Sequence, residues 1–259
     1  MGVTGVVRRA GRGVERYGPA QFLKEAATRP LRPVLAPAAG ARLRRLAATR
    51  AGVDELLDLA FEADPLGITI RPGQVRSEIR RLLLEVRGCS RMLEIGTANG
   101  GTLFLFARVA AADAHLISVD LPHGEFGGGY PSWRIPLYRR FPRDGQRLDL
   151  LRCDSHAPRT VAHVRELLDG KPLDVLFIDG DHTYDGVRQD FETYAPLVRP
   201  GGLIALHDIA PPAPGAPPSA AALQGGDVPA YWAQLRGRFA HEELCDAPYG
   251  NFGIGLLRV

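Results

Sequence analysis

Two acids and a histidine follow an apolar run in the segment DVLFIDGDHTYDGVRQD, as Asp179, Asp181 and His182. Carboxylate oxygens suit Mg²⁺ and Mn²⁺, and histidine titrates near neutrality, so it can act as a general base. In the plainer interpretation, Asp181 and Thr183 only cap the next helix and His182 lies in solvent. We favour the chemical interpretation because a second run ends in the same way.

That second run, Leu203 to Leu206, ends in His207 and Asp208. The carboxyl ends of parallel strands meet at one edge of a sheet, so the acids of both runs are expected to lie together. Carboxylates that meet repel each other unless a cation or protons compensate. The pattern therefore predicts a cation site, where oxygen ligands favour Mg²⁺ or Mn²⁺ and an imidazole would also admit Fe, Co or Ni.

A glycine-bearing turn follows an earlier strand in MLEIGTANGGT, residues 92–102. Gly96 and Gly100 let backbone approach a ligand closely, and Glu94 can accept a hydrogen bond from an ammonium group. The glycines do not have the G-x-G-x-x-G spacing, which disfavours a nicotinamide enzyme.

Two further strand ends carry polar residues. Asp120 closes HLISVD, where an acid can accept from both hydroxyls of a ribose. Asp154 and Ser155 end LLRCDSH and could meet an adenine amino group. Each is by itself also consistent with a simple cap, but together they favour a nucleoside-like ligand.

Short apolar runs alternate with helical periodicity between these sites. Strands are expected at 91–95, 116–119, 148–153, 174–178 and 203–206, and helices at 56–61, 75–86, 102–111, 161–168 and 184–194. The alternation predicts an α/β fold with a Rossmann-like, doubly wound and mostly parallel sheet. Residues 242–245 and 252–257, joined by a turn at 248–250, predict a C-terminal antiparallel hairpin.

The chain has 259 residues, 45% of them hydrophobic and 24% charged, as in ordinary globular proteins. Residues 1–50 hold 11 Lys and Arg against 2 acids, and Pro30, Pro33 and Pro37 are expected to break any long helix there. We predict a basic, partly helical N-terminal extension at 1–60 and one domain at 61–259. The acidic remainder of the chain argues against a nucleic-acid substrate.

Three distant cysteines, Cys89, Cys153 and Cys245, suit a reducing compartment, and no apolar run approaches the roughly 18 residues of a membrane span. A cytoplasmic protein without a membrane span is therefore expected, and its oligomeric state stays open, a homodimer included.

Two long segments, 122–147 and 210–229, resist assignment and follow strand ends, where loops often serve as lids. Aromatic residues of the first are expected to form a wall over an acceptor, with ordinary loop packing as the alternative. The candidate substrate contacts are Tyr130, Trp133, Tyr138 and Asp181.

Taken together, these motifs resemble the class I S-adenosylmethionine (SAM)-dependent methyltransferases over roughly residues 71–259. Glu94-x-Gly96 with Gly100 resembles that family's first motif, and the hairpin its reversed last strand. The resemblance implies SAM as cofactor. The cofactor-binding residues would be Glu94, Gly96, Thr97, Asn99, Gly100, Asp120, Asp154, Ser155 and Asp179.

The stretch FIDGDHTYDGVRQDFETYAPLVRPGGLIALHDI looks like that of the metal-dependent small-molecule O-methyltransferases, including macrolide-sugar methyltransferases and their cephalosporin-pathway relatives. The resemblance implies Asp179, His207 and Asp208 as metal ligands, for Mg²⁺ or Mn²⁺, and His182 as the catalytic base. His207 departs from the pattern, because relatives usually carry an acid there. This weakens the case for Mg²⁺ or displaces ligation onto Asp208 and Asp181.

The predicted function is therefore metal-assisted O-methylation of a small hydroxylated molecule, of sugar or natural-product type. N-methylation and methylation of a catechol-type acceptor are alternatives. A non-catalytic SAM-binding partner protein is another, which the intact Asp179, His182 and Asp208 oppose because a pure binder would not need them.

Overall fold

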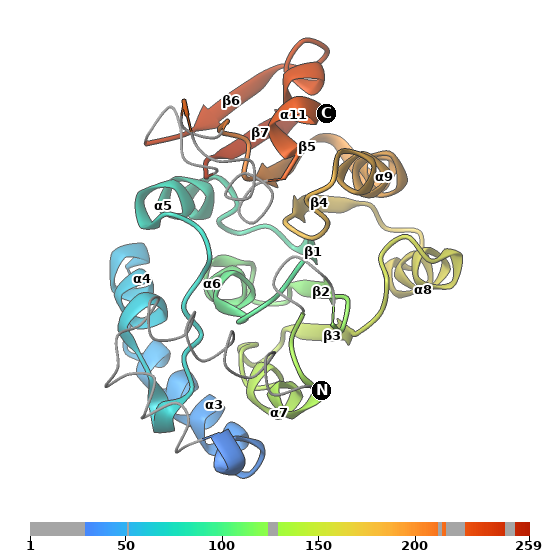
Figure 1. Cartoon of the computed structure of the whole chain (residues 1–259). Coiled ribbons are helices and arrows are strands. Elements are labelled where there is room, and N and C mark those ends of the chain that lie inside the picture. Colours follow the sequence, from blue (N-terminus) through green and yellow to red (C-terminus); the bar gives the residue numbers. More distant parts are fainter. Residues whose placement is uncertain (1–28, 51, 124–128, 212–213, 216–225, 247–251) are drawn as a thin grey trace, which may run out of the picture.

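The computed structural model of the chain describes residues 29–50, 52–123, 129–211, 214–215, 226–246 and 252–259. It contains a seven-stranded sheet in the order β3-β2-β1-β4-β5-β7-β6 (Figure 1). The parallel strands are β1 (Arg91–Ile95), β2 (His115–Val119), β3 (Arg147–Leu151), β4 (Leu173–Ile178) and β5 (Val198–His207). β7 (Ile254–Arg258) pairs antiparallel with both β5 and β6 (His241–Leu244). The predicted sheet and its antiparallel C-terminal hairpin are confirmed, while the turn expected at 248–250 lies outside the described residues.

Helices cover both faces of the sheet (Figure 1). One face carries α3 (Arg32–Ala48), α4 (Val53–Glu62), α5 (Arg76–Glu85), α6 (Gly101–Val109) and α7 (Ile135–Tyr138). The other carries α8 (Pro158–Leu168), α9 (Tyr184–Tyr194) and α11 (Val228–Leu235). Single turns of 3₁₀ helix lie at Arg29–Leu31 (η1), Pro65–Gly67 (η2), Ser132–Arg134 (η3) and Ala195–Leu197 (η4). No helix in these ranges is long and apolar enough to cross a membrane.

Burial on both faces explains why the central strands are nearly continuous apolar runs. In β4 every residue except Asp174 is buried, and Asp174 lies at the start of the strand, where it accepts from the backbone N–H groups of Ser90 and Arg91. The sequence thus places the strand and its polar end correctly.

The expectation that prolines prevent a long helix near the N-terminus is wrong. α3 runs for 17 residues with Pro33 in its first turn and Pro37 inside it. A proline in the first turn removes no helical hydrogen bond, and Pro37 removes one. The helix is held by its buried face, and Gly40 lets it approach α7 closely, because a Cβ there would overlap the carbonyl of Leu137.

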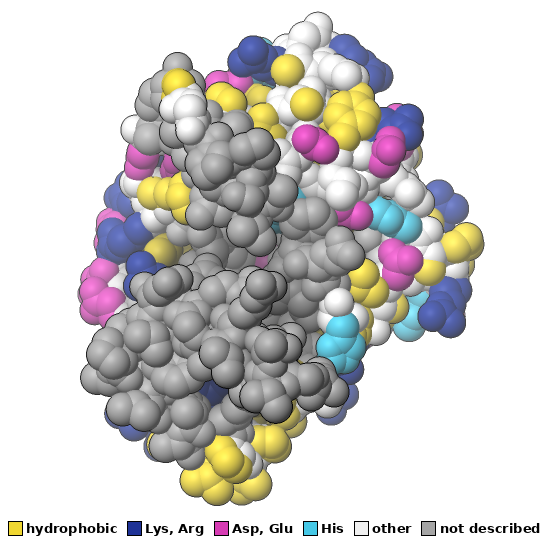
Figure 2. All heavy atoms as spheres, in the orientation of Figure 1, with side chains coloured by type: hydrophobic (Ala, Val, Ile, Leu, Met, Phe, Trp, Pro, Cys, Tyr) yellow, Lys and Arg dark blue, Asp and Glu magenta, His cyan; other side chains and the backbone are white. Residues whose placement is uncertain are grey.

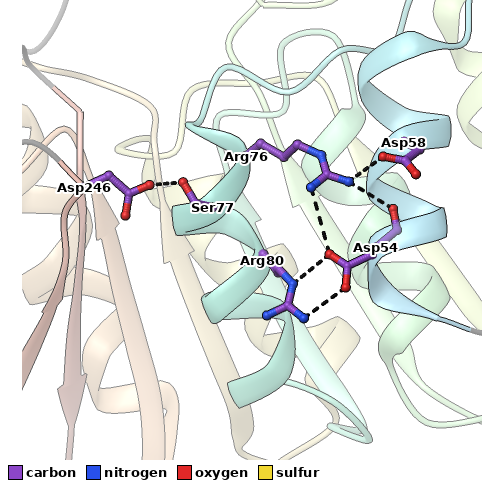
Figure 3. A network of polar contacts seen from close by, with 6 residues as sticks. All are labelled: Asp54, Asp58, Arg76, Ser77, Arg80 and Asp246. Carbon is purple, nitrogen blue, oxygen red and sulfur yellow. Dashed lines mark hydrogen bonds and ion pairs between the residues drawn. The ribbon is translucent and has the colours of Figure 1, made fainter.

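Polar contacts join α4 to α5 (Figure 3). Arg80 donates to both carboxylate oxygens of Asp54, at 2.7 and 2.9 Å, and Arg76 pairs with Asp58. On the face shown in Figure 2, side chains of both charges are interspersed along this flank. The described part of the predicted extension therefore packs on the sheet's helical layer, and the boundary at residue 60 stays a prediction.

Gly96 is the turn residue that lets the chain after β1 approach the end of β4. Its φ is +88°, and a Cβ at this position would overlap the carbonyl of Asp179 at the end of β4. Only glycine combines that backbone conformation with such a close approach.

We expect Gly96→Ala to lower the free energy of unfolding by about 3 kcal/mol or more, because backbone strain and overlap with β4 add. Gly88→Ala is the matched control, since its φ is +79° but nothing lies within 4 Å of its Cβ position. It should lose only the strain, about 1–2 kcal/mol. Urea unfolding of both variants measures the difference, and equal losses would contradict a tight contact at Gly96.

Candidate functional site

A cavity of about 410 Å³ opens where the carboxyl ends of β1, β2, β3 and β4 meet. β1 and β4 are neighbours between which the chain order of the sheet reverses, the usual place for a ligand in such sheets. Five of the nine predicted cofactor residues line this cavity: Gly96, Asp120, Asp154, Ser155 and Asp179. We call it the donor cavity.

Asp120 has a fixed orientation in the donor cavity. Its Oδ2 accepts from the backbone N–H groups of Ala98 and Tyr130 at 3.0 and 3.1 Å. Burial raises the pKa of Asp120 to about 6 despite these hydrogen bonds. Both recorded bonds go to Oδ2, so Oδ1 can serve a ligand.

The other four predicted cofactor residues lie beside the donor cavity without lining it. Glu94 is buried and its Oε2 accepts from Thr97, whose hydroxyl also lies 2.6 Å from that of Ser118. Asn99 is held by Arg134, which donates to its side-chain oxygen at 3.2 Å.

Gly100 directly precedes α6, has a φ of +81° and packs on the ring of Tyr138. Tyr138 is fully buried, and its hydroxyl donates to the carbonyl of Ala98. Tyr130 is 2% exposed and stacks edge-on against Tyr138, while Trp133 packs on the same core. Tyr138 thus supports the glycine turn, and the three rings pack in the core as the loop-packing alternative expects. Their role as substrate contacts stays a prediction.

Asp179 is the residue that joins the donor cavity to a second group of polar side chains. Its Oδ2 accepts from the amide of Gln74 at 2.6 Å, and its Oδ1 lies 3.0 Å from His207 Nδ1 and 3.6 Å from His182 Nε2. Asp208 lies 3.4 Å from His182 Nδ1, the ring nitrogen that does not face Asp179, and 3.2 Å from His207 Nδ1, the same nitrogen that faces Asp179.

Two carboxylates and two imidazoles thus share one buried space, and we call Asp179, His182, His207 and Asp208 the acid–histidine group. Burial alone would lower the pKa of His207, but the charges of Asp179 and Asp208 raise it well above its ordinary value. Asp208 has a φ of +61°, a conformation that asparagine and aspartate adopt more readily than other non-glycine residues. Backbone strain of this kind is typical of functional sites.

The donor atoms for a cation are present in this group. Asp179, His182 and Asp208 each offer one ligand atom, and these atoms lie within 4.8 Å of one another. Two carboxylates and an imidazole fit a divalent ion. His207 Nδ1 is instead turned to the carboxylates, which suits a residue that orients ligands more than a ligand itself.

The capping interpretation is also partly realised. Thr183 Oγ1 accepts from Gly186 N–H at the start of α9, and Asp181 Oδ1 accepts from Thr183 N–H. Asp181 also lines the donor cavity. His182 does not lie in solvent, because its side chain is 15% exposed and sits between Asp179 and Asp208.

Sequence reasoning missed three polar residues of the site. Gln74 is 4% exposed and is itself held by the hydroxyl of Thr102. His156 lines the donor cavity, and its Nε2 lies 3.1 Å from Asp190, which is fully buried in α9. The one signal in the sequence for this pair was Asp190, an acid on the inward face of the amphipathic helix α9.

A family model described as a methyltransferase domain matches residues 93–209, which span the donor cavity and the acid–histidine group. Residues 93–209 are therefore similar to a methyltransferase domain. This match and the fold agree with the sequence-based resemblance to the class I methyltransferases.

Solved structures share the fold of this chain. The O-methyltransferase of Bacillus cereus, in complex with SAH, is 17% identical, with 85% of this chain and 97% of that chain covered and a TM-score of 0.51. MycE of the mycinamycin biosynthetic pathway, in complex with Mg, SAH and mycinamycin VI, is 19% identical, with 81% and 55% covered and a TM-score of 0.50.

Curated relatives match parts of this chain. An uncharacterized protein of Sinorhizobium fredii is 28% identical over 170 residues, 64% of this chain and 17% of that protein. An uncharacterized protein of Acanthamoeba polyphaga mimivirus is 29% identical over 127 residues, 45% of this chain and 50% of that protein. The chain thus spans half or less of the length of these relatives.

The His156–Asp190 pair predicts a pH effect. The carboxylate of Asp190 raises the pKa of His156, so the pair stabilises the fold below the unfolded pKa of histidine, about 6.5, and this stabilisation is lost as pH rises through the higher folded value. Asp190→Asn should lower the His156 pKa in an NMR titration and reduce stability most at acid pH. Asp185→Asn, an exposed acid on the same helix, is the control. An unchanged His156 pKa in Asp190→Asn would refute the pairing.

Proposed function

We propose that the protein transfers the methyl group of SAM to a hydroxyl oxygen of a small molecule, of sugar or natural-product type. The observation that carries this proposal is the position of Asp179, which lines the donor cavity and also belongs to the acid–histidine group. A donor in the cavity and an acceptor at that group would meet at this residue. The transfer then depends mainly on holding the two reactants in line.

The donor cavity fits SAM in its polar atoms. Glu94 Oε1 is buried and has no hydrogen-bond partner among the described residues, so it can accept from the ammonium of the amino-acid part. Burial and the charges of Asp120 and Asp179 raise the pKa of Glu94, and an ammonium beside it would oppose that rise. Asp120 Oδ1 is available for the ribose, and Asp154 and Ser155, which also line the cavity, would meet the adenine.

His182 is the base in this proposal. A sugar hydroxyl is a poor nucleophile until a base accepts its proton. Burial lowers the pKa of His182, but the carboxylates of Asp179 and Asp208 outweigh that effect and raise it. The proton of the acceptor hydroxyl would pass to this imidazole while the oxygen attacks the methyl carbon of the sulfonium, leaving SAH.

A divalent ion is a further part of the proposal. Asp179 and Asp208 would hold it, and it would supply Lewis-acid polarisation of the acceptor hydroxyl, while His182 stays free to act as the base. We also propose a small hydroxylated acceptor, a cytoplasmic location and no nucleic-acid partner. These proposals rest on the arguments from the sequence given above.

Donor binding tests the first half of the function. We expect SAM and SAH to bind with micromolar affinity in calorimetry, and Asp120→Asn to weaken both by about tenfold, because one charged hydrogen bond to the ribose is lost. Since Asp120 ionises at a pKa of about 6, the affinity of the wild-type protein should fall as pH drops below that value. No binding by folded protein would refute SAM as the donor.

Turnover of His182→Ala tests the second half. With glycosylated and phenolic acceptors screened by mass spectrometry, we expect this variant to lose about 10²–10⁴-fold in rate while still binding SAM. The wild-type rate should increase with pH through a pKa above 6.5, as His182 loses its proton. His163→Ala, an exposed histidine of α8, is the control. Near-normal turnover in His182→Ala would sink the base assignment, and SAM binding without any methylated product would favour the non-catalytic alternative.

A further inference from the structure

A second hollow, of about 640 Å³, lies at the opposite edge of the sheet from the donor cavity. The end of α3, the start of α4 and the end of α6 form its walls. Gly88 precedes β1 and Arg143 precedes β3, so the hollow lies where the parallel strands begin, whereas the donor cavity lies where they end. Nothing in the proposed methyl transfer uses it.

Arginine dominates the lining of this hollow. The lining contains one acid, Asp144, and the five arginines Arg44, Arg50, Arg87, Arg108 and Arg143. Asp144 is 97% exposed and pairs with Arg44. Within the described ranges, no carboxylate lies at ion-pair distance from the other four arginines. A hollow with this excess of positive charge attracts anions.

Arg108 is the arginine whose environment is hardest to explain without a ligand. Its Nε and Nη2 atoms are buried and have no hydrogen-bond partner among the residues that the structure describes. Its guanidinium lies over the ring of Phe104, 5.5 Å from the centroid. Burial and the nearby charges of Arg143 and Arg44 lower the pKa of Arg108 to about 10, so it remains charged at neutral pH.

Arg143 repeats the same pattern. One of its terminal nitrogens donates to the carbonyl of Ala110 at the end of α6, but its Nε is also buried without a partner. Buried charged donors without acceptors destabilise a fold, and arginine cannot lose its proton to relieve this. An anion that accepts from both residues would remove the penalty.

We propose that this arginine hollow binds the phosphate groups of a small molecule that carries at least two phosphates. The planar guanidinium places two N–H groups against two oxygens of a phosphate, and several such groups around one hollow suit a compact polyanion. Arg108 and Arg143 line a hollow that a small ligand can enter, whereas a membrane surface or a duplex would meet only exposed side chains. Free pyrophosphate and the phosphates of a nucleotide share this chemistry.

Calorimetry with inorganic pyrophosphate at constant ionic strength tests the proposal. We expect pyrophosphate to bind at least about tenfold more tightly than inorganic phosphate or sulfate, because a second phosphate engages further arginines. GTP distinguishes the sources: tighter binding of GTP than of pyrophosphate identifies a nucleotide site, and equal or weaker binding a pyrophosphate site. A guanosine nucleotide avoids competition for a donor cavity with an adenine end.

Arg108→Met keeps the packing on Phe104 and should weaken pyrophosphate binding by about tenfold or more. Arg87→Gln changes an exposed lining residue, so it should fold and still weaken binding a few-fold. Arg188→Met, on α9 and paired with Asp185, is the matched control and should bind as the wild type does. Pyrophosphate should also raise the melting temperature of the wild type but not of Arg108→Met.

Three results would overturn the proposal. They are no pyrophosphate binding by the folded wild-type protein, equal binding of pyrophosphate and sulfate at one ionic strength, and an equal loss in Arg188→Met and both lining variants. Binding of an oligonucleotide or anionic vesicles but not of pyrophosphate would assign the hollow to another class of partner. None of these readouts depends on methyl transfer.

Discussion

The close contact between the turns after β1 and β4 is the constraint on which the candidate site depends. The N–H of Asp179 donates to the carbonyl of Ile95 at 2.8 Å, and Gly96 lets the two backbones meet without a side chain between them. Asp179 belongs both to the donor cavity and to the acid–histidine group. One backbone contact therefore sets the distance between the donor cavity and the acid–histidine group.

The electrostatics of the site follow from that convergence. Strands β4 and β5 bring Asp179 and Asp208 into one buried space, and burial of two carboxylates would be unfavourable without positive partners. His182 and His207 contact both carboxylates, and the amide of Gln74 donates a hydrogen bond to Asp179 Oδ2. At the other edge of the sheet, positive charge is in excess. There the described residues supply one acid, Asp144, against five arginines. The two ends of the same strands thus carry different side chains, acids and histidines at one end and arginines at the other.

The features that depend on local pattern were predictable from the sequence. β1 and α9 begin and end where the periodicity predicts, because their burial is continuous in one case and confined to one face in the other. Proline statistics failed for α3, since tertiary burial of one helix face outweighs the loss of a hydrogen bond at Pro37. Gln74 was missed because its partner is 105 residues away, a separation that no local pattern reveals. The burial of Tyr138 was not predictable, because an aromatic residue in a long unassigned segment has the same sequence signal whether it covers a ligand or supports a glycine turn.

The left-handed backbone at Asp208 limits how this site can change over generations. A carboxylate with one more methylene, as in glutamate, would preserve the charge but would meet a backbone conformation that it rarely adopts. Asparagine and glycine tolerate the conformation, yet neither carries the negative charge. If an acid is needed at this position, aspartate is therefore the one residue type that fits. The substitutions that the backbone tolerates, asparagine and glycine, keep the backbone conformation but remove the negative charge.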